Sequence, residues 1–467
     1  MSLLSADPQL TKNSYYAATA PREQRFPALQ SNLDSDVAVV GGGLAGLSAA
    51  IELAERGFSV VLLEAREVGW GASGRNGGQV IAGLACEQST IEQQIGEAES
   101  RKVWGMTLEA LRLIGERRER FGIDCDWQPG YLSVAIGARK ARALQTWQQH
   151  MQRAYAYDTQ WIGPQDLAGW IASPRFHSGV HDPLGGHLHP LKYSLGLARA
   201  AAGLGVRIHE NSAVVGVEPG STVRVRTATG CVSASHVLLA GNVYLNGLAP
   251  VLERRIMPVG TYIVASEPLA PPLARSLVPS QSAVCDTNFV LDYFRPVTSA
   301  GPPQASDAPP GGRTATPAGG GDGTDHRMLY GGRVSYSTAT PMHLARSMQS
   351  RMARTFPQLQ GTKVEFAWGG FVDISMNRAP DFGRLPDRDA RGSAKAHANV
   401  YYLQGFSGHG LALTGLAGRL VAEAIAGSAE RFDTFARLRH RPFPGGRFMR
   451  TPALVAGMAY YRLKDML

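Results

Sequence analysis

The segment from Asp36 to Glu64 constrains the fold more than any other part of the chain. DVAVV is a continuous apolar run rich in β-branched residues, which predicts a buried parallel strand. GGGLAG follows, and LSAAIELAERG then has apolar residues at helical spacing with Gly57 at the C-cap. FSVVLLE is a second buried strand. Together these elements predict one βαβ unit and therefore an α/β domain.

The turn after the first strand carries the pattern GxGxxG at Gly41, Gly43 and Gly46. The first glycine permits the tight turn, the second lets the backbone approach a pyrophosphate, and the third allows the helix to pack closely on the strand. The diphosphate would lie on the positive end of the helix that begins near Leu44. Glu64 follows Gly43 by 21 residues, where a carboxylate accepts hydrogen bonds from ribose hydroxyls. A carboxylate here disfavours a 2′-phosphate, so FAD or NAD is predicted rather than NADP.

A second glycine-rich segment, VGWGASGRNGGQ (68–79), favours FAD over NAD. Its glycines let a loop lie against a flat ligand with backbone N–H groups exposed, and Ser73, Arg75, Asn76 and Gln79 add side-chain donors. Such a loop suits a pyrophosphate and an isoalloxazine edge together. A mobile glycine loop without a ligand is the alternative interpretation.

A third glycine-rich turn, LQGFSGHGLALTGLAG, opens a helix at about Leu411. Its N-terminal N–H groups are expected to face the pyrimidine end of the flavin, where the helix dipole would stabilise the negative charge of the reduced ring. His409 in this turn is a candidate catalytic base, and a positioning or packing role is the alternative.

Two later apolar strands, 235–242 and 399–405, are expected to return to the first sheet, which makes the FAD-binding domain discontinuous. Between them lie a long amphipathic helix and a strand-rich region. A Pro/Gly-rich stretch inside that region predicts a flexible loop at the tip of a hairpin. The predicted FAD-binding domain comprises 30–105, 185–245 and 366–430, the substrate domain comprises 106–184 and 246–365 with the insertion 298–326, and 431–467 form a C-terminal tail.

Three of these segments, GGGLAGLSAAIELAERG, GASGRNGG and GFSGHGLALTGLAGRLVAEAI, resemble the D-amino-acid oxidase-type family of FAD-dependent oxidoreductases. Within it, SYYAAT, GWGASGRNGGQ, HLHPLKYSLGLARAA, LYGGRVSYS and PFPGGR resemble the members that oxidise gamma-glutamylputrescine. The resemblance covers nearly the whole chain apart from the insertion. It implies an α/β plus α+β architecture, with a Rossmann-like FAD-binding domain and a substrate domain on a large antiparallel sheet. It also implies an enzyme that oxidises a carbon–nitrogen bond.

The resemblance assigns Glu64 to the adenosine ribose, Gly43 to the pyrophosphate, and the backbone of Val214 to the adenine. FAD is expected to be held without a covalent bond, because the Cys or His that attaches flavin in some relatives has no counterpart in the matching motif. The residues predicted to bind FAD are Gly41, Gly43, Leu44, Ala45, Gly46, Glu64, Ala65, Arg66, Gly71, Ala72, Ser73, Arg75, Asn76, Gly77, Gly78, Gln79, Val214, Gly241, Gly405, Ser407, Gly408, His409, Gly410 and Leu411.

One departure from the family pattern concerns the substrate. Relatives that oxidise amino acids carry an arginine that clamps the substrate carboxylate, and Val372 stands at that position here. A buried carboxylate without a partner is costly, so an amine without an adjacent carboxylate is favoured. Arg378 could substitute if its loop folds back. Four aromatic residues are candidates for the substrate pocket: Tyr262, Phe289, Tyr293 and Trp368.

We therefore expect oxidation of a primary amine resembling gamma-glutamylputrescine to an aldehyde and ammonia. Oxygen, giving hydrogen peroxide, or another acceptor would take the electrons. One alternative is a D-amino-acid or sarcosine-type dehydrogenase or oxidase of the same family. Another is a flavin-binding accessory subunit without its own substrate.

Composition excludes several other classes. The formal charge of +9 is spread along the chain, which argues against a nucleic-acid-binding protein. The four cysteines lie far apart without a CxxC pair, and His187 and His189 lack the further ligands of a metal site, so no metal is predicted. No secretory signal or transmembrane run is visible, and a cytoplasmic location is expected. The basic C-terminal tail is expected to pack on the protein surface, with contact to a membrane interface as the alternative. The sequence leaves the oligomeric state open.

Overall fold

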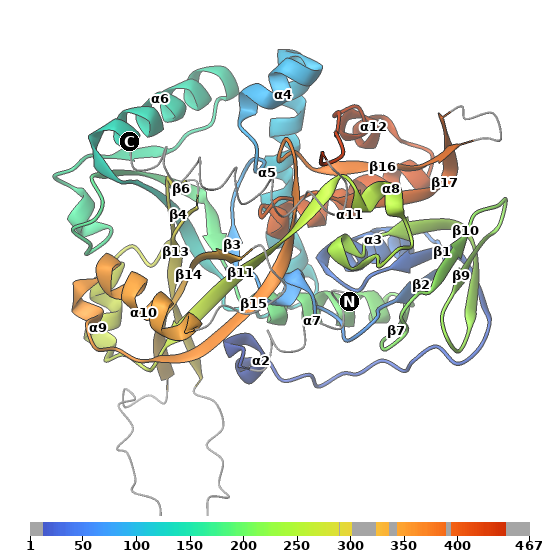
Figure 1. Cartoon of the computed structure of the whole chain (residues 1–467), viewed down its shortest axis with the longest axis horizontal. Helices are drawn as coiled ribbons and strands as arrows, with labels where there is room; N and C mark the ends of the chain where they lie inside the picture. Colours follow the sequence, from blue (N-terminus) through green and yellow to red (C-terminus); the bar gives the residue numbers. More distant parts are fainter. Residues whose placement is uncertain (1–12, 289, 301–323, 336–342, 389–393, 445–467) are drawn as a thin grey trace, which may run out of the picture.

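The computed structural model describes residues 13–288, 290–300, 324–335, 343–388 and 394–444. Within these ranges the chain forms two sheets, one of eight and one of nine strands, which occupy the two halves of the molecule (Figure 1). Helices cover both halves. The chain crosses between the sheets several times, so each sheet is assembled from segments far apart in the sequence.

The first sheet holds the predicted βαβ unit. Strand β1 (Leu33–Val40) pairs in parallel with β2 (Val60–Leu63) and β10 (Cys231–Leu239), and β10 pairs in parallel with β17 (Ala394–Gln404). The prediction that the two later strands return to this sheet is confirmed. The remaining strands are β7 (Arg207–His209) beside β2, β16 (Asp381–Arg388) antiparallel to β17, and the hairpin β8 (Gly216–Glu218) and β9 (Val223–Arg226) beside β10.

The central strands of this sheet are buried on both faces. Val37 and Val39 pack on one side against helices, whereas Ala38 and Val40 pack into a separate core on the other side. A strand buried on both faces has no polar alternation, which is why its sequence is an unbroken apolar run.

A layer of helices covers one face of this sheet, and three of these helices are joined by close packing and by buried ion pairs. Helices α3 (Leu44–Glu55) and α11 (Gly410–Ile425) approach so closely that a Cβ at Gly418 would lie 2.5 Å from the backbone nitrogen of Ala49. The buried carboxylate of Glu52 on α3 accepts from Arg117 on α5 (Glu97–Arg120) and from Arg419 on α11, both at 3.0 Å. Helix α5 therefore packs on the nucleotide-binding half, although residues 106–120 were expected to begin the substrate domain.

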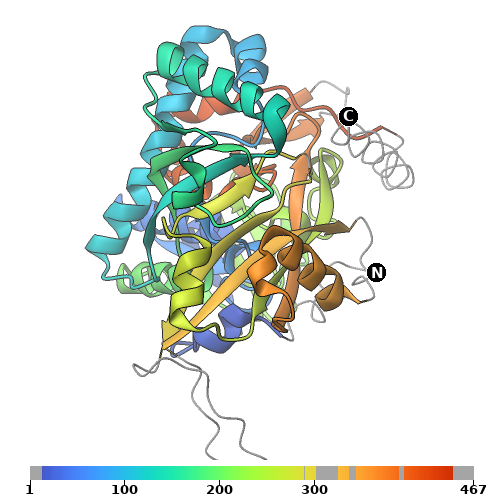
Figure 2. The same cartoon turned by 90° about the vertical axis from the view of Figure 1, so that its left-hand side faces the viewer.

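The second sheet is antiparallel except for one parallel pair, β12 (Ala283–Asp286) with β4 (Gln128–Ala135). Helices α6 (Gly137–Tyr155), α9 (Pro271–Leu277) and α10 (Leu344–Thr355) belong to this half, which faces the viewer in Figure 2. On one side of this pair, next to β12, lie in order β13 (Tyr293–Ala300), β14 (Thr324–Ser335), β11 (Ile256–Ser266) and the edge strand β15 (Val364–Ser375). On the other side, next to β4, lie β6 (Ser178–His187) and then β3 (Gln79–Val80), and β5 (Gln160–Ile162) also pairs with β6.

Strands β15 and β3 lie inside segments predicted for the FAD-binding domain, and both take part in the second sheet. Strand β15 pairs along its length with β11, and β3 pairs with the end of β6. The reason is physical: both segments leave the nucleotide-binding half to complete hydrogen-bonded ladders of the other sheet. Of these two strands, β3 carries a residue predicted to bind FAD, Gln79.

The predicted hairpin in the strand-rich region is confirmed, since β13 and β14 pair antiparallel from Tyr293 to Ala300 and from Thr324 to Gly331. Both ends of the expected insertion 298–326 are thus strand, and residues 301–323 lie outside the described part. The other elements are α2 (Tyr15–Thr19), α4 (Gln88–Ile95), α7 (Pro190–Gly203), α8 (Pro250–Glu253), α12 (Glu430–Ala436) and the 3₁₀ turns η2 (Ala72–Gly74), η3 (Leu167–Gly169), η4 (Asn242–Tyr244) and η5 (Pro357–Leu359).

Within the described ranges, no single helix has the length and apolar character needed to cross a membrane. Helices α11 and α12 meet those criteria only as a pair bent by 119°. Of the expected C-terminal tail, α12 packs Phe432 and Phe435 into the core of the first half, and 445–467 lie outside the described residues.

Candidate active site

Predicted cofactor residues follow four adjacent strands of the first sheet. In sheet order, Gly405 follows β17, Gly241 lies two residues after β10, Gly41 follows β1 and Glu64 follows β2. Because these four strands are parallel, their carboxyl ends meet at one edge of the sheet. Ligands of open α/β sheets bind at this edge.

The first turn at this edge has no room for side chains. Gly41 has φ +114°, and a Cβ there would lie 2.6 Å from the carbonyl oxygen of Ala240. A Cβ at Gly46 would lie 2.0 Å from the carbonyl oxygen of Gly41. Gly43 is the N-cap of α3 and has no side chain to satisfy the N–H groups of the first helical turn. The turn therefore fits a diphosphate held by backbone N–H groups.

Glu64 lies beside this turn in a fixed orientation. Its carboxylate accepts from the N–H groups of Gly42 at 2.7 Å and Arg66 at 2.8 Å, and burial raises the pKa of this carboxyl. Each oxygen keeps capacity for a further hydrogen bond, which suits ribose hydroxyls. The backbone N–H of Ser212 donates to the Glu64 carbonyl at 2.8 Å and brings the segment leading to Val214 alongside.

The second glycine-rich loop is organised by its own side chains. Asn76 donates to the carbonyls of Ala72 and Ser73 at 3.0 Å and accepts from the N–H of Gly78 at 2.8 Å. Ser73 Oγ accepts from the N–H of Leu44 at 2.9 Å, so this loop contacts the start of α3 directly. The guanidinium of Arg75 lies over the ring of Trp70, 4.3 Å from its centroid.

Two buried side chains of the second sheet hold the same loop in place. The Trp368 indole N–H donates to the carbonyl of Arg75 at 3.0 Å. Arg295, 3% exposed, donates to the carbonyls of Gly77 at 2.8 Å and Leu188 at 2.9 Å. Trp368 was predicted to line the substrate pocket, and in the structure its indole N–H supports this loop. Arg295 was not predicted, because a single arginine in a strand gives no local signal.

A buried carboxylate organises the third turn. Asp373, at the end of β15, accepts from the N–H groups of Gly405 and Phe406, and its carbonyl accepts from Ser407 at 3.0 Å. Burial raises the pKa of Asp373 to about 6. His409 is the N-cap of α11, and burial together with the charge of Arg378 lowers its pKa to about 4. The imidazole is therefore neutral at pH 7.

A cavity of about 220 Å³ adjoins this turn. Its lining includes His409, the segment 81–88 that directly follows the flavin loop, and side chains of β4, β6, α5 and α6. The lining also includes Tyr131, Tyr157, Trp104 and Asp182, which were not predicted because they come from separate segments: β4, the loop after α6, α5 and β6. The predicted aromatic residues Tyr262, Tyr293 and Trp368 are absent from the described lining of this cavity, and Phe289 lies outside the described residues.

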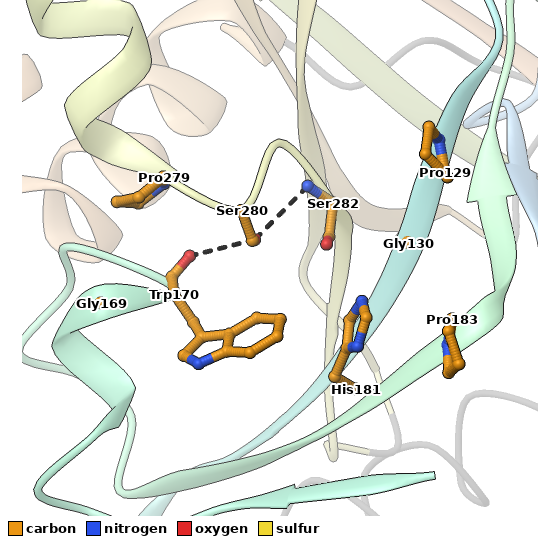
Figure 3. A pocket seen from close by; sticks show the side chains of 9 residues that line it. All are labelled: Pro129, Gly130, Gly169, Trp170, His181, Pro183, Pro279, Ser280 and Ser282. Atoms are coloured by element: carbon orange, nitrogen blue, oxygen red, sulfur yellow. Dashed lines mark hydrogen bonds between the residues drawn. The ribbon is translucent and has the colours of Figure 1, made fainter. Parts of the chain in front are cut away.

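A larger hollow of about 420 Å³ lies on the other face of the same strands (Figure 3). On β6, His181 and Pro183 line this hollow whereas Val180 and Asp182 line the smaller cavity, as expected for alternating residues of a strand. The ring of His181 packs on Trp170 with centroids 4.6 Å apart. The smaller cavity includes His409 of the third turn in its lining, whereas the described lining of the larger hollow includes no residue of the glycine-rich turns, so the smaller cavity is the candidate substrate site.

His187 and His189 are both occupied by protein partners. His187 contacts Arg295 at 3.0 Å and the Gln281 carbonyl at 2.9 Å, and burial lowers its pKa to about 3. His189 accepts from the N–H of Lys192 at 3.2 Å and contacts Thr19 Oγ1 at 3.0 Å. In the part of the chain that the structure describes, no three His, Cys, Asp or Glu residues gather as metal ligands.

Comparison with known proteins agrees with this geometry. Residues 36–424 match the model of the DAO family, described as FAD dependent oxidoreductase. The chain is 40% identical to gamma-glutamylputrescine oxidoreductase of Escherichia coli over 97% of its own length and 98% of that protein. It is 36% identical to a probable oxidoreductase, OrdL, of Haemophilus influenzae, with 97% of each chain covered.

Among solved structures, glycine oxidase from Geobacillus kaustophilus superposes with a TM-score of 0.67 at 21% identity, covering 85% of this chain and 95% of that one. This likeness supports the two-domain flavoenzyme fold. The strand edge with its glycine turn, the Glu64 carboxylate beside that turn and the family match agree with one another. The chain therefore belongs to the DAO family of FAD-dependent oxidoreductases.

Proposed function

We propose that this enzyme oxidises a primary amine resembling gamma-glutamylputrescine to the corresponding aldehyde and ammonia, with oxygen as electron acceptor and hydrogen peroxide as product. The observation that carries the proposal is the 40% identity to gamma-glutamylputrescine oxidoreductase over nearly the full length of both chains. When bound, FAD supplies the two-electron acceptor for the carbon–nitrogen bond.

The chain's own residues would bind the cofactor and fix its surroundings. The turn at Gly41–Gly46 would hold the diphosphate, Glu64 the ribose, and the Asn76-organised loop the isoalloxazine edge. The N-terminus of α11 would face the pyrimidine end, where its dipole stabilises negative charge. We propose that these contacts are non-covalent. Flavin released into the supernatant by acid denaturation would support this, and flavin that stays with the precipitate would contradict it.

Residues beside the cavity support an uncharged, deprotonated amine as the reacting group. His409 is neutral at pH 7 because burial and the charge of Arg378 lower its pKa. A low-dielectric site lowers the pKa of the substrate amine in the same way, which leaves its lone pair free as hydride departs from the α-carbon. The resulting imine is then hydrolysed by water.

Val372 supports an amine rather than an α-amino acid. It is a half-buried residue of β15, at the position where amino-acid-oxidising relatives carry a carboxylate-binding arginine. An α-carboxylate placed there would lose its solvation without gaining a cation.

A second candidate function, oxidation of a D-amino acid or sarcosine, has one observation in its favour. Arg378 lies close enough to Cys86 and His409 to influence the pKa of both, and both residues line the cavity. Its guanidinium could therefore meet a substrate carboxylate. If this candidate is right, Arg378→Gln would abolish turnover of the amino acid. If the amine proposal is right, the same variant would leave oxidation of the amine largely unchanged, because that substrate has no carboxylate near the reacting carbon.

Product analysis tests the proposed reaction. The FAD-loaded enzyme with gamma-glutamylputrescine should consume one oxygen for each hydrogen peroxide, aldehyde and ammonia formed. If aldehyde and ammonia form only when an artificial electron acceptor is present, oxygen is not the electron acceptor of this enzyme. Turnover of D-alanine or sarcosine in place of the amine would support the second candidate. Protein that contains flavin but reacts with no amine or amino acid would indicate an accessory subunit.

A further inference from the structure

We propose that the cavity beside His409 binds the zwitterionic amino-acid head of the substrate, with Asp182 receiving its ammonium group and the donors of Trp104 and Thr159 receiving its carboxylate. The oxidised amine would lie at the opposite end of the same ligand. This inference rests on the proposed function, because it assigns residues to the far end of a gamma-glutamylated amine.

Asp182 is a buried carboxylate without a protein cation. It is 6% exposed, and it accepts from the phenol of Tyr157 and from the N–H of Leu184 at 2.9 Å. None of the ion pairs formed among the described residues includes Asp182. A buried anion supported only by neutral donors is expensive, and a ligand cation would compensate it.

Aromatic rings surround the space in front of this carboxylate. Trp104, Trp147, Tyr131 and Tyr157 line the cavity, and the rings of Trp104 and Tyr157 meet edge to face with centroids 4.9 Å apart. Aromatic faces attract ammonium groups, most strongly where water is excluded. Asp182 and these rings together form a site for an ammonium group.

Two buried donors in the same cavity have no protein acceptor. The indole N–H of Trp104 and the hydroxyl of Thr159 are without hydrogen-bond partners among the described residues, although both side chains are more than nine-tenths buried. Leaving a buried donor without a hydrogen-bond acceptor is costly, so we expect a ligand to supply the acceptor. A carboxylate accepts from two donors at once.

The charge pattern selects the ligand class. One anionic acceptor and two unpaired donors match an α-ammonium and an α-carboxylate on a single carbon. A simple diamine would satisfy Asp182 but leave both donors unpaired. His409 and the segment 81–88 connect the cavity to the flavin turn, so a ligand with its head near Asp182 would extend toward the cofactor.

Matched substrates separate head recognition from oxidation. Gamma-glutamylputrescine and N-acetylputrescine carry the same reacting amine, the same four-carbon spacer and an amide, and only the first has the zwitterionic head. Asp182→Asn and Thr159→Val should each raise KM for gamma-glutamylputrescine by roughly 10- to 100-fold with kcat little changed, because each removes an interaction with a charged group. KM for N-acetylputrescine should be unchanged.

Controls keep the proposal falsifiable. Asp166→Asn makes the same chemical change at an exposed position and should alter neither KM. If Asp182→Asn fails to fold, as judged by circular dichroism and flavin content, Thr159→Val, which exchanges one hydroxyl for a methyl, decides the question. Equal KM changes for both substrates, or none for gamma-glutamylputrescine, would overturn the inference.

A binding measurement separates failure of the inference from failure of the proposed function. Gamma-glutamyl-n-butylamide keeps the head but lacks the terminal amine that is proposed to be oxidised, and its binding to the FAD-loaded enzyme can be followed by calorimetry. Binding that Asp182→Asn weakens, in an enzyme that does not oxidise gamma-glutamylputrescine, would support the head site and refute the reaction. Oxidation with head binding unaffected by Asp182→Asn would do the reverse.

Discussion

Replacing Gly46 by alanine tests whether the glycine turn is built to hold the cofactor. The added Cβ would lie 2.0 Å from the carbonyl oxygen of Gly41 and 3.2 Å from Val39 Cγ1. The first distance is about 1 Å shorter than the shortest contacts that Cβ atoms make in real structures. Its partner is a backbone atom, which cannot rotate away as a flexible side chain could. The start of α3 must therefore move away from β1. Overpacking substitutions of this kind cost about 1–3 kcal/mol of free energy.

This displacement should affect FAD binding more than folding. If cofactor binding requires α3 in its original position, the strain appears as a rise in Kd of roughly 5- to 150-fold. The assay is titration of the FAD-free protein with FAD, followed by quenching of flavin fluorescence. Gly105→Ala is the control, because Gly105 is an exposed residue of α5, its added Cβ meets nothing within 4 Å, and the change should stabilise the helix by about 0.5–1 kcal/mol. Wild-type FAD affinity in Gly46→Ala would refute the reasoning.

Three other predictions follow from buried groups around the flavin site. Trp368→Phe removes the donor to the Arg75 carbonyl, so it should lower the free energy of unfolding by about 1–3 kcal/mol and weaken FAD binding. Urea denaturation and flavin titration measure the two effects, and unchanged values would contradict the support role of Trp368. Asp373 has a folded pKa of about 6 against an ordinary 3.8, so the folded state holds its proton more tightly and stability falls as pH rises between these values. Relative to Asp373→Asn, the wild type should lose roughly 2 kcal/mol between pH 4 and pH 7 in denaturation curves, and a constant difference would contradict this. Tyr262→Phe and Tyr293→Phe should leave turnover and KM unchanged in steady-state assays, because neither residue is in the described lining of the cavity, and impaired kinetics in either would show that its hydroxyl acts in the reaction.

The nucleotide-binding elements could be predicted because their signals are local. The glycines at 41, 43 and 46 and Glu64 occupy fixed positions along one βαβ unit, and the buried strands are unbroken apolar runs. The structure places these residues at one edge of the parallel sheet, as the spacing indicates.

The cavity could not be predicted, because tertiary packing alone brings its residues together. Trp104 lies on α5, Tyr131 on β4, and Asp182 on β6, and each has an ordinary interpretation in its own segment. The same reason explains Arg295 and Asp373, which support glycine turns far away in the sequence. Strands β3 and β15, which lie inside segments predicted for the FAD-binding domain, likewise complete the second sheet through pairings with distant segments.

The most direct test of the proposed activity is an anaerobic visible spectrum of the FAD-loaded enzyme before and after gamma-glutamylputrescine is added. The proposal predicts that the flavin bands bleach with this amine and not with D-alanine or sarcosine, and that they return when oxygen is admitted. Bands that persist with the amine, or that bleach with D-alanine, would contradict it.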